Sequence, residues 1–302
     1  MPLPLSYPGL KCVLENLEAV KRVHIIGRSP SLQKIDKLIP YCLENLCVDF
    51  HEMTINNLLI TCNEDGVKFE MNWKRLSRQK LETQNDKMKK LVNFYICGRS
   101  KTRVNKLDWF YSLLPCFLAV DTKFRVNTLY ALLCEDFELS RSFIDSRSFP
   151  LKTVVTIPEP SNFDSQIVKS AETLILYLLI DRTLTVEDLK KLNNKTVVLE
   201  YCSSSIIDMI PLIQYHVETK DDIRTTFVIP SNYEGVINEM LSEFEQAFDE
   251  FRCDLDGVNE RFIPGLSKFS IPINGDSKIH VYAIENPDEG PNKIIVKPVS
   301  GF

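Results

Sequence analysis

The sequence predicts a mixed α/β protein, and three observations lead to this prediction. Short apolar stretches at helical spacing fill the first 40 residues. Strand-like segments alternate with short helical ones through the middle of the chain. An amphipathic helix and three strand-like segments follow. With 302 residues, 44% of them hydrophobic and 25% charged, the chain has enough apolar material for a sizeable core.

Three short helices are predicted in the first 40 residues. Pro8 stands where prolines start helices, Ser31 is a candidate N-cap, and Pro40 ends the third helix. Each helix is too short to be stable alone, so the three must pack on each other, on the rest of the chain or on a partner. Their apolar residues recur at helical spacing: Leu10, Val13, Leu14, Leu17, Val23, Ile25, Ile26, Leu32, Ile35 and Leu38.

Strands are predicted next, at residues 46–50, 53–61 and 67–71, with a turn at Asp65-Gly66. The basic stretch 74–106 follows and is interpreted as a linker. The predicted domains are therefore a helical segment (1–45), short strands with a basic linker (46–106), and an α/β domain (107–302).

The basic stretch has eleven basic residues against Glu82 and Asp86, a charge of +9, so the rest of the chain carries −14 of a net −5. A solvated loop or a docking patch is the favoured interpretation. Nucleic-acid binding is the alternative, with Trp73, Phe94 and Tyr95 as stacking residues. The basic residues are Lys74, Arg75, Arg78, Lys80, Lys87, Lys89, Lys90, Arg99, Lys101, Arg103 and Lys106.

The middle of the chain contains a weak repeat. Buried strands are predicted at 151–157, 173–179 and 195–201, and they begin about 22 residues apart. This spacing lies in the 20–29 residue range of leucine-rich repeats, although the consensus asparagine is missing. Helices at 186–192 and 206–217 and a strand at 226–229 continue the alternation. A parallel, leucine-rich-repeat-like run with helices outside is expected.

The last third of the sequence predicts a helix followed by an antiparallel meander of strands. Residues 234–251 form a strongly amphipathic helix with a phenylalanine-rich face. Three strands then follow, at 268–273, 278–285 and 293–299. Asn274-Gly275 provides the first turn between them.

No catalytic, cofactor-binding or metal-binding residue is predicted, and the chain is interpreted as a non-enzyme. It has no phosphate loop, nucleophile elbow or zinc-binding helix. The four histidines are isolated, and Cys42 and Cys47 lack a second pair. We expect a soluble protein of the cytoplasm or nucleus. The nine cysteines show no disulfide framework, and the sequence shows no secretory signal and no membrane span.

The stretch from Leu5 to Ala19, followed by Lys21-Arg22, resembles the opening of a nematode family of F-box-like proteins. The downstream region of that family is a nematode-specific domain of unknown function. Tyr7-Pro8 stands where an F-box has Leu-Pro, and Arg22 matches its arginine, but the later tryptophan is absent. Further segments resemble the same family: 28–37, 39–40, 208–215, 223–227 and 271–273.

This resemblance implies a protein-interaction adaptor, with the N-terminal helices docking a Skp-type adaptor of an SCF-type ubiquitin ligase and the α/β region capturing an unknown target. Helix-in-groove recognition would use apolar anchors, which a plain structural interpretation instead buries in the chain's own core. A scattered enzyme site and a diverged member that keeps only the fold are further alternatives. The candidate partner-binding residues are Pro8, Leu10, Val13, Leu14 and Leu17.

Overall fold

The computed structural model forms two compact units, residues 1–151 and 152–302, which are described separately. It describes residues 7–49, 51–71, 74–79, 83–99, 101–109, 118, 121–178, 184–201, 209–255, 257–286 and 290–300. The domain boundaries expected near residues 45 and 106 remain predictions.

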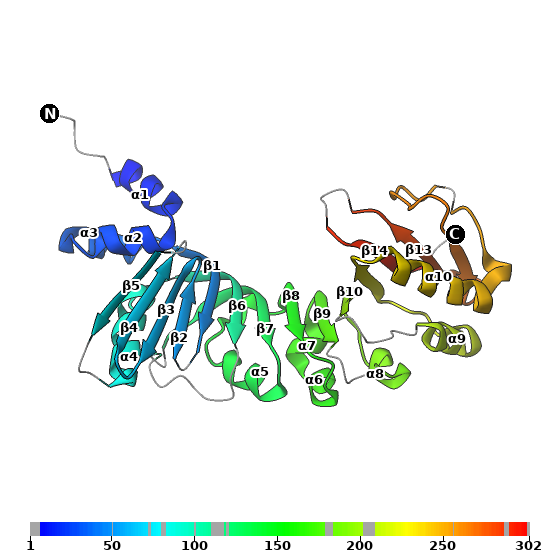
Figure 1. Cartoon of the computed structure of the whole chain (residues 1–302), viewed down its shortest axis with the longest axis horizontal. Helices are drawn as coiled ribbons and strands as arrows, with labels where there is room; N and C mark the ends of the chain where they lie inside the picture. The colour runs from blue at the N-terminus through cyan, green and yellow to red at the C-terminus, as the bar shows by residue number, and fades with distance from the viewer. Residues whose placement is uncertain are drawn as a thin grey trace. The chain divides into compact units, whose positions relative to one another are not determined.

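The first unit is a mixed sheet with helices at one end and beneath it (Figure 1). Its strand order is β7-β6-β1-β2-β3-β4-β5. Strands β1, β6 and β7 are parallel, whereas β1 to β5 form an antiparallel meander. Its elements are α1 (Tyr7–Asn16), α2 (Ala19–Ile26), α3 (Pro30–Asp36), β1 (Tyr41–Val48), β2 (Glu52–Ile55), β3 (Leu58–Asn63), β4 (Gly66–Met71), β5 (Lys74–Gln79), α4 (Gln84–Tyr95), β6 (Thr102–Trp109), β7 (Phe124–Ala131), α5 (Cys134–Arg141) and η1 (Ser146–Ser148).

Three details of the first unit differ from the sequence predictions. The basic stretch is not a loop, since it contributes β5, α4 and most of β6. The segment predicted as one strand over 53–61 is a hairpin, in which Asn56 adopts a left-handed backbone conformation (φ 52°) that asparagine tolerates well. Helix α3 begins at Pro30 with Ser29 as its N-cap, so Ser31 is not the cap.

Strands β1, β6 and β7 form a repeat that was not predicted from the sequence. Arg103-Val104-Asn105 on β6 and Arg125-Val126-Asn127 on β7 recur 22 residues apart, and the arginines and valines pair with each other across the ladder. Both strands bury the same positions, and β1 follows nearly the same pattern. The repeating parallel run therefore begins earlier in the chain than the three predicted strands.

The second unit has the strand order β12-β13-β14-β11-β10-β9-β8. Strands β8 to β11 are parallel with helices between them, and β11 to β14 are antiparallel. Its elements are β8 (Thr153–Thr156), α6 (Pro160–Asp164), α7 (Gln166–Ser170), β9 (Thr173–Leu178), α8 (Val186–Lys190), β10 (Thr196–Tyr201), α9 (Ile210–Thr219), β11 (Thr226–Ser231), α10 (Glu234–Phe248), η2 (Asp249–Phe251), β12 (Phe269–Pro272), β13 (Ser277–Ile284) and β14 (Asn292–Ser300).

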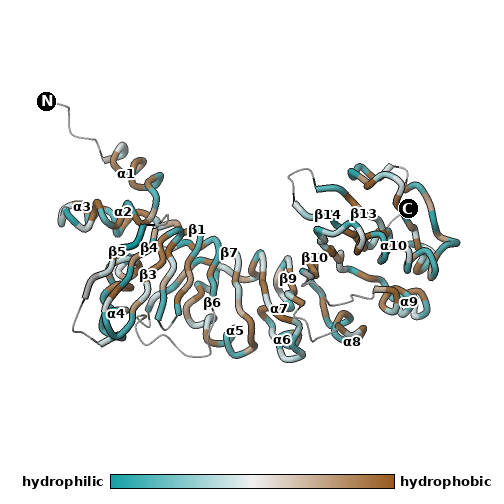
Figure 2. Tube along the Cα trace, in the orientation of Figure 1, coloured by the Kyte–Doolittle hydropathy of each residue, from teal (hydrophilic) through white to brown (hydrophobic). Residues whose placement is uncertain are grey.

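Helix α10 confirms the predicted amphipathic helix. It buries Ile237, Leu241, Phe244 and Phe248, and the rings of Phe244 and Phe269 lie 6.1 Å apart. In Figure 2, hydrophobic and hydrophilic residues alternate along its tube, as one-sided packing requires. The three-strand meander is also confirmed.

The predicted fold class, a mixed α/β protein with a parallel run and a C-terminal antiparallel meander, is thus confirmed. The start of the helix predicted from residue 206 lies outside the described residues, and α9 is described from Ile210. Within the described part of the chain, no helix is both long and apolar enough to cross a membrane.

Buried amide side chains secure the loops that connect the parallel strands. Asn194 is 1% exposed, and its Nδ2 donates to the carbonyls of Val168 and Ala171 at 2.8 and 2.7 Å. These two bonds fasten the loop before β10 to the end of α7. Asn194-Lys195-Thr196 has the Asn-x-Ser/Thr pattern of a glycosylation acceptor, and the burial of Asn194 argues against its use as one.

We expect Asn194→Ala to lower the free energy of unfolding by about 1–3 kcal/mol, because the buried carbonyl of Ala171 loses its side-chain donor and that of Val168 keeps only the Ala171 backbone N–H. Urea denaturation followed by circular dichroism measures the change. Asn193→Ala is the matched control, since the neighbouring Asn193 is exposed. Equal destabilisation by the two variants would contradict the assignment.

Candidate interaction surfaces

The three N-terminal helices have a small core of their own. Leu14 from α1, Ile26 from α2 and Ile39 after α3 are each no more than 3% exposed and pack together. Leu10, Leu32 and Ile35 pack against this cluster. The helices are therefore held by mutual packing, which short helices need.

Each of these three core residues has an apolar neighbour in sequence that is exposed. Val13 is 48% exposed beside Leu14, Ile25 is 52% exposed beside Ile26, and Leu38 is 69% exposed beside Ile39. On α1 and α2, consecutive residues point in directions about 100° apart, so one member of each pair can enter the core while the other faces out. Leu38 and Ile39 lie in the turn after α3. The N-terminal segment is thus apolar inside and carries apolar side chains outside.

The five candidate partner-binding residues do not share one environment. Leu14 is buried in the helical core and Leu10 packs against it. Leu17 is partly buried, whereas Pro8 and Val13 are exposed. Contact between Leu14 and a partner would require the helices to separate. Among the five candidate residues, Val13 is the large aliphatic residue that is exposed.

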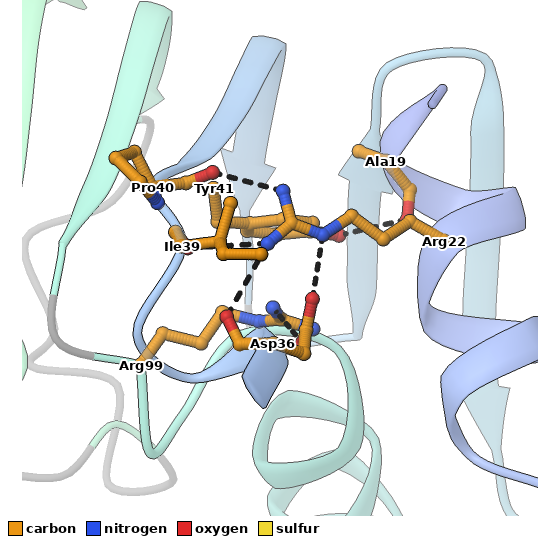
Figure 3. Close-up of polar contacts among 7 residues, drawn as sticks. All are labelled: Ala19, Arg22, Asp36, Ile39, Pro40, Tyr41 and Arg99. Atoms are coloured by element: carbon orange, nitrogen blue, oxygen red, sulfur yellow. Dashed lines mark hydrogen bonds and ion pairs between the residues drawn. The ribbon is translucent and has the colours of Figure 1, made fainter. Parts of the chain in front are cut away.

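A buried ion-pair network attaches these helices to the sheet (Figure 3). The guanidinium of Arg22 on α2 donates to the Asp36 carboxylate at 2.6 Å. It also donates to the carbonyls of Asp36, Ile39 and Pro40 at 3.3, 3.1 and 2.8 Å. Arg22 thereby satisfies carbonyl groups at and beyond the C-terminal end of α3, which the helix itself leaves without donors.

Two further residues extend the network. Arg99, after α4, donates to the second Asp36 oxygen, and its guanidinium lies 4.0 Å from the centre of the Tyr41 ring. The Tyr41 hydroxyl donates to the carbonyl of Ala19 at 3.3 Å, and burial raises the pKa of this phenol well above its usual range. Segments from α2, α3, β1 and the loop after α4 therefore meet at one buried carboxylate.

A groove of about 750 Å³ lies where the meander meets the helices. Strands β3, β4 and β5 line one side, and α4 and α2 line the other. Its apolar walls include Val20, Leu58, Phe69, Leu76, Leu91 and Phe94, and lysines from β5 and α4 also line it. A concave, mainly apolar site of this size is typical of ligand-binding pockets.

The outward face of β1, β6 and β7 is polar and hydrogen-bonded. Asn127 donates to Asn105 at 3.1 Å, and Asn105 donates to Glu44 at 3.4 Å. Arg103 and Arg125 stand beside each other in register on the same face. Parallel repeat sheets present such rows of side chains to binding partners.

Several residues of the basic stretch are paired or buried in the described part of the chain. Arg75 pairs with Glu70, Lys106 with Asp108, and Arg99 with the buried Asp36. Lys87 is buried. Of the proposed stacking residues, Tyr95 is buried, Phe94 is half-exposed in the groove, and Trp73 lies outside the described residues.

Among the described residues, no cluster of three or more metal-ligating side chains occurs. His24 bonds the Tyr95 hydroxyl at 3.1 Å, and His216 Nδ1 contacts the Asp221 carbonyl oxygen at 2.8 Å. Burial, reinforced by nearby carboxylates such as Asp108, raises the pKa of the Cys47 thiol to about 12.

We expect Arg22→Met to destabilise the N-terminal helices by about 1–3 kcal/mol, because the Asp36 carboxylate keeps only Arg99 as its partner and the carbonyls of Ile39 and Pro40 lose the guanidinium donor. Amide hydrogen exchange over residues 19–39 measures the loss of protection. Lys21→Met is the control, because Lys21 is exposed. Unchanged protection in Arg22→Met would exclude the anchoring role.

We expect iodoacetamide to modify Cys42 much faster than Cys47 at pH 8, although both lie on β1. Cys42 is exposed, and with a pKa of about 12 only on the order of one Cys47 thiol in ten thousand is the reactive thiolate. Modification of Cys47 should accelerate as the pH rises towards 12. Peptide mass spectrometry at several pH values tests this, and equal rates at pH 8 would contradict it.

Comparison with known proteins places one domain on this chain. The family model described as a domain of unknown function, DUF3557, matches residues 83–232, from the N-cap of α4 to just beyond β11. No curated protein and no solved structure matches the chain. The matched range includes the parallel strands β6 to β11 and excludes the N-terminal helices and the C-terminal meander. The chain therefore contains a DUF3557 domain.

Proposed function

We propose that the protein is an interaction adaptor whose N-terminal helices dock a partner. The observation that carries this proposal is the set of exposed aliphatic side chains, Val13, Ile25 and Leu38, on a segment that already has a complete small core. Exposed apolar residues beyond the needs of the core favour a protein-binding surface. Residues such as Val13 would anchor in a partner's groove, as amphipathic helices do.

The partner proposed is a Skp-type adaptor of an SCF-type ubiquitin ligase, in the cytoplasm or nucleus. The resemblance of residues 5–40 to F-box-like openings supports this choice. The network around Arg22, the residue that matches the F-box arginine, would hold the helices in place while they dock. The role is therefore recruitment and not catalysis.

Target capture is proposed for the polar face of β1, β6 and β7. Its residues are positioned by a ladder of side-chain hydrogen bonds from Asn127 to Glu44. Ordered donors and acceptors on a rigid sheet lose little conformational entropy on binding, which favours specific recognition. This face would display the target beside the docked scaffold subunit.

Nucleic-acid binding has weaker support. Binding to phosphates needs unpaired cations that act together, and several of the basic residues in 74–106 are paired or buried. We therefore keep it as an alternative, for which a steep salt dependence of binding would be the sign.

A pull-down of a Skp-type adaptor by the full chain and by Val13→Glu tests the proposal. Wild type should capture the adaptor, and Val13→Glu should weaken capture about tenfold or more, because a charge would enter an apolar contact. Val13 is half-exposed, so the substitution leaves the Leu14 cluster in place. Unchanged circular dichroism verifies the fold.

The controls separate docking from folding. Leu133→Glu places the same charge at an exposed leucine on the N-cap of α5 and should leave capture unchanged. Leu14→Ala should lower stability by about 2–5 kcal/mol, as expected for a core leucine. Absence of capture by folded wild type would refute the Skp-type partner.

A further inference from the structure

The groove of the first unit exists because α4 covers only part of the apolar face of the meander. On β3, Ile60 and Cys62 are fully buried. On the outer strands the same face emerges into solvent, with Met71 on β4 37% exposed and Leu76 on β5 55% exposed. Phe94 on α4 is 46% exposed opposite them, so apolar side chains line both walls of an open channel.

Lys87 is the unusual residue of this groove. Its side chain lines the groove, and the residue is 2% exposed. Its Nζ donates to the carbonyls of Asn63 and Glu64, both at 3.1 Å. An ammonium has three donors, and among the described residues these two neutral carbonyls are its acceptors, with no carboxylate in contact. A buried cation that lacks a counter-charge is costly, and a bound anion would remove that cost.

The other charged residues that line the groove are also cationic. Lys74 on β5 and Lys90 on α4 also line the groove, and no Asp or Glu does so within the described part of the chain. Along α4 the lining changes from Lys87 and Lys90 in its first half to Leu91 and Phe94 in its second half. One end of this wall therefore favours negative charge, and the other favours an apolar chain.

We propose that this groove binds a single-chain amphiphile with an anionic head group, a carboxylate or phosphate on an alkyl chain. The head group pairs with Lys87, and the alkyl chain lies between Leu76 and Phe94. The volume of about 750 Å³ is in the range that encloses small ligands. Burial of the alkyl chain against these apolar side chains removes it from water and so favours binding.

Isothermal titration of the full chain with dodecanoate and dodecyl phosphate, below their micelle concentrations, tests this proposal. Both should bind with one-to-one stoichiometry, whereas dodecyltrimethylammonium, with the same chain and a cationic head, should bind at least tenfold more weakly. Acetate and inorganic phosphate alone should not bind measurably. Equal affinity for the cationic and anionic amphiphiles would overturn the proposal.

Matched lysine variants locate the head group. Lys87→Met keeps the aliphatic stem and should weaken dodecanoate binding about tenfold or more, because a hydrogen bond to a charged group is lost. Lys90→Glu should weaken it by a similar factor. Lys89→Glu makes the same change at an exposed neighbour on α4 that does not line the groove, and should alter affinity less than twofold. Equal losses in Lys89→Glu and Lys90→Glu would count against a specific site.

The apolar wall is tested by Leu76→Asp, with Leu133→Asp as its control at another exposed leucine. Only Leu76→Asp should abolish binding. Two further titrations distinguish the sources of the anionic head group. Binding of phosphatidylglycerol vesicles or of an acidic helical peptide, without binding of monomeric dodecanoate, would assign the groove to a membrane surface or to a protein partner and reject the proposal.

Discussion

The first unit depends on one buried carboxylate. Asp36 is held between Arg22 and Arg99, and these three residues come from α2, α3 and the loop after α4. Pairs of this kind add little net stability relative to apolar packing, because desolvation offsets the Coulomb attraction. They do fix the relative positions of the paired residues, since moving one of them away would leave a buried charge with fewer partners. The orientation of the N-terminal helices on the sheet is therefore fixed by charge pairing as well as by apolar contact.

This constraint explains how so short a helical segment can present a defined surface. Helices of seven to ten residues have little intrinsic stability, and their shared core rests on Leu14, Ile26 and Ile39. The Arg22 guanidinium donates to the carbonyls of Ile39 and Pro40. These bonds connect α2 to the segment between α3 and β1. Exposed side chains on such a segment are held in place before any partner arrives, which lowers the entropic cost of docking.

The sequence predicted most of the fold because its signals were local. Short apolar runs identified β8 to β10, and the phenylalanine face identified α10. Strands β6 and β7 were missed because polar residues, such as Arg103 and Asn105 on β6, made their segments look polar, although the recurrence of Arg-Val-Asn could have revealed them. The groove and the burial of Lys87 could not be predicted, because both depend on how far α4 extends over the meander, which is a property of tertiary packing.

Helix α2 links the two proposed surfaces of this unit. It buries Arg22 in the ion-pair network, exposes Ile25, and contributes Val20 and His24 to the groove. An eight-residue helix has only about two turns, so any movement of its axis would displace all of these side chains together. Substitutions in α2 would thus confound partner docking with ligand binding. The two properties can be separated only through residues on other elements, with Val13 on α1 reporting the docking surface and Lys87 and Lys90 on α4 reporting the groove.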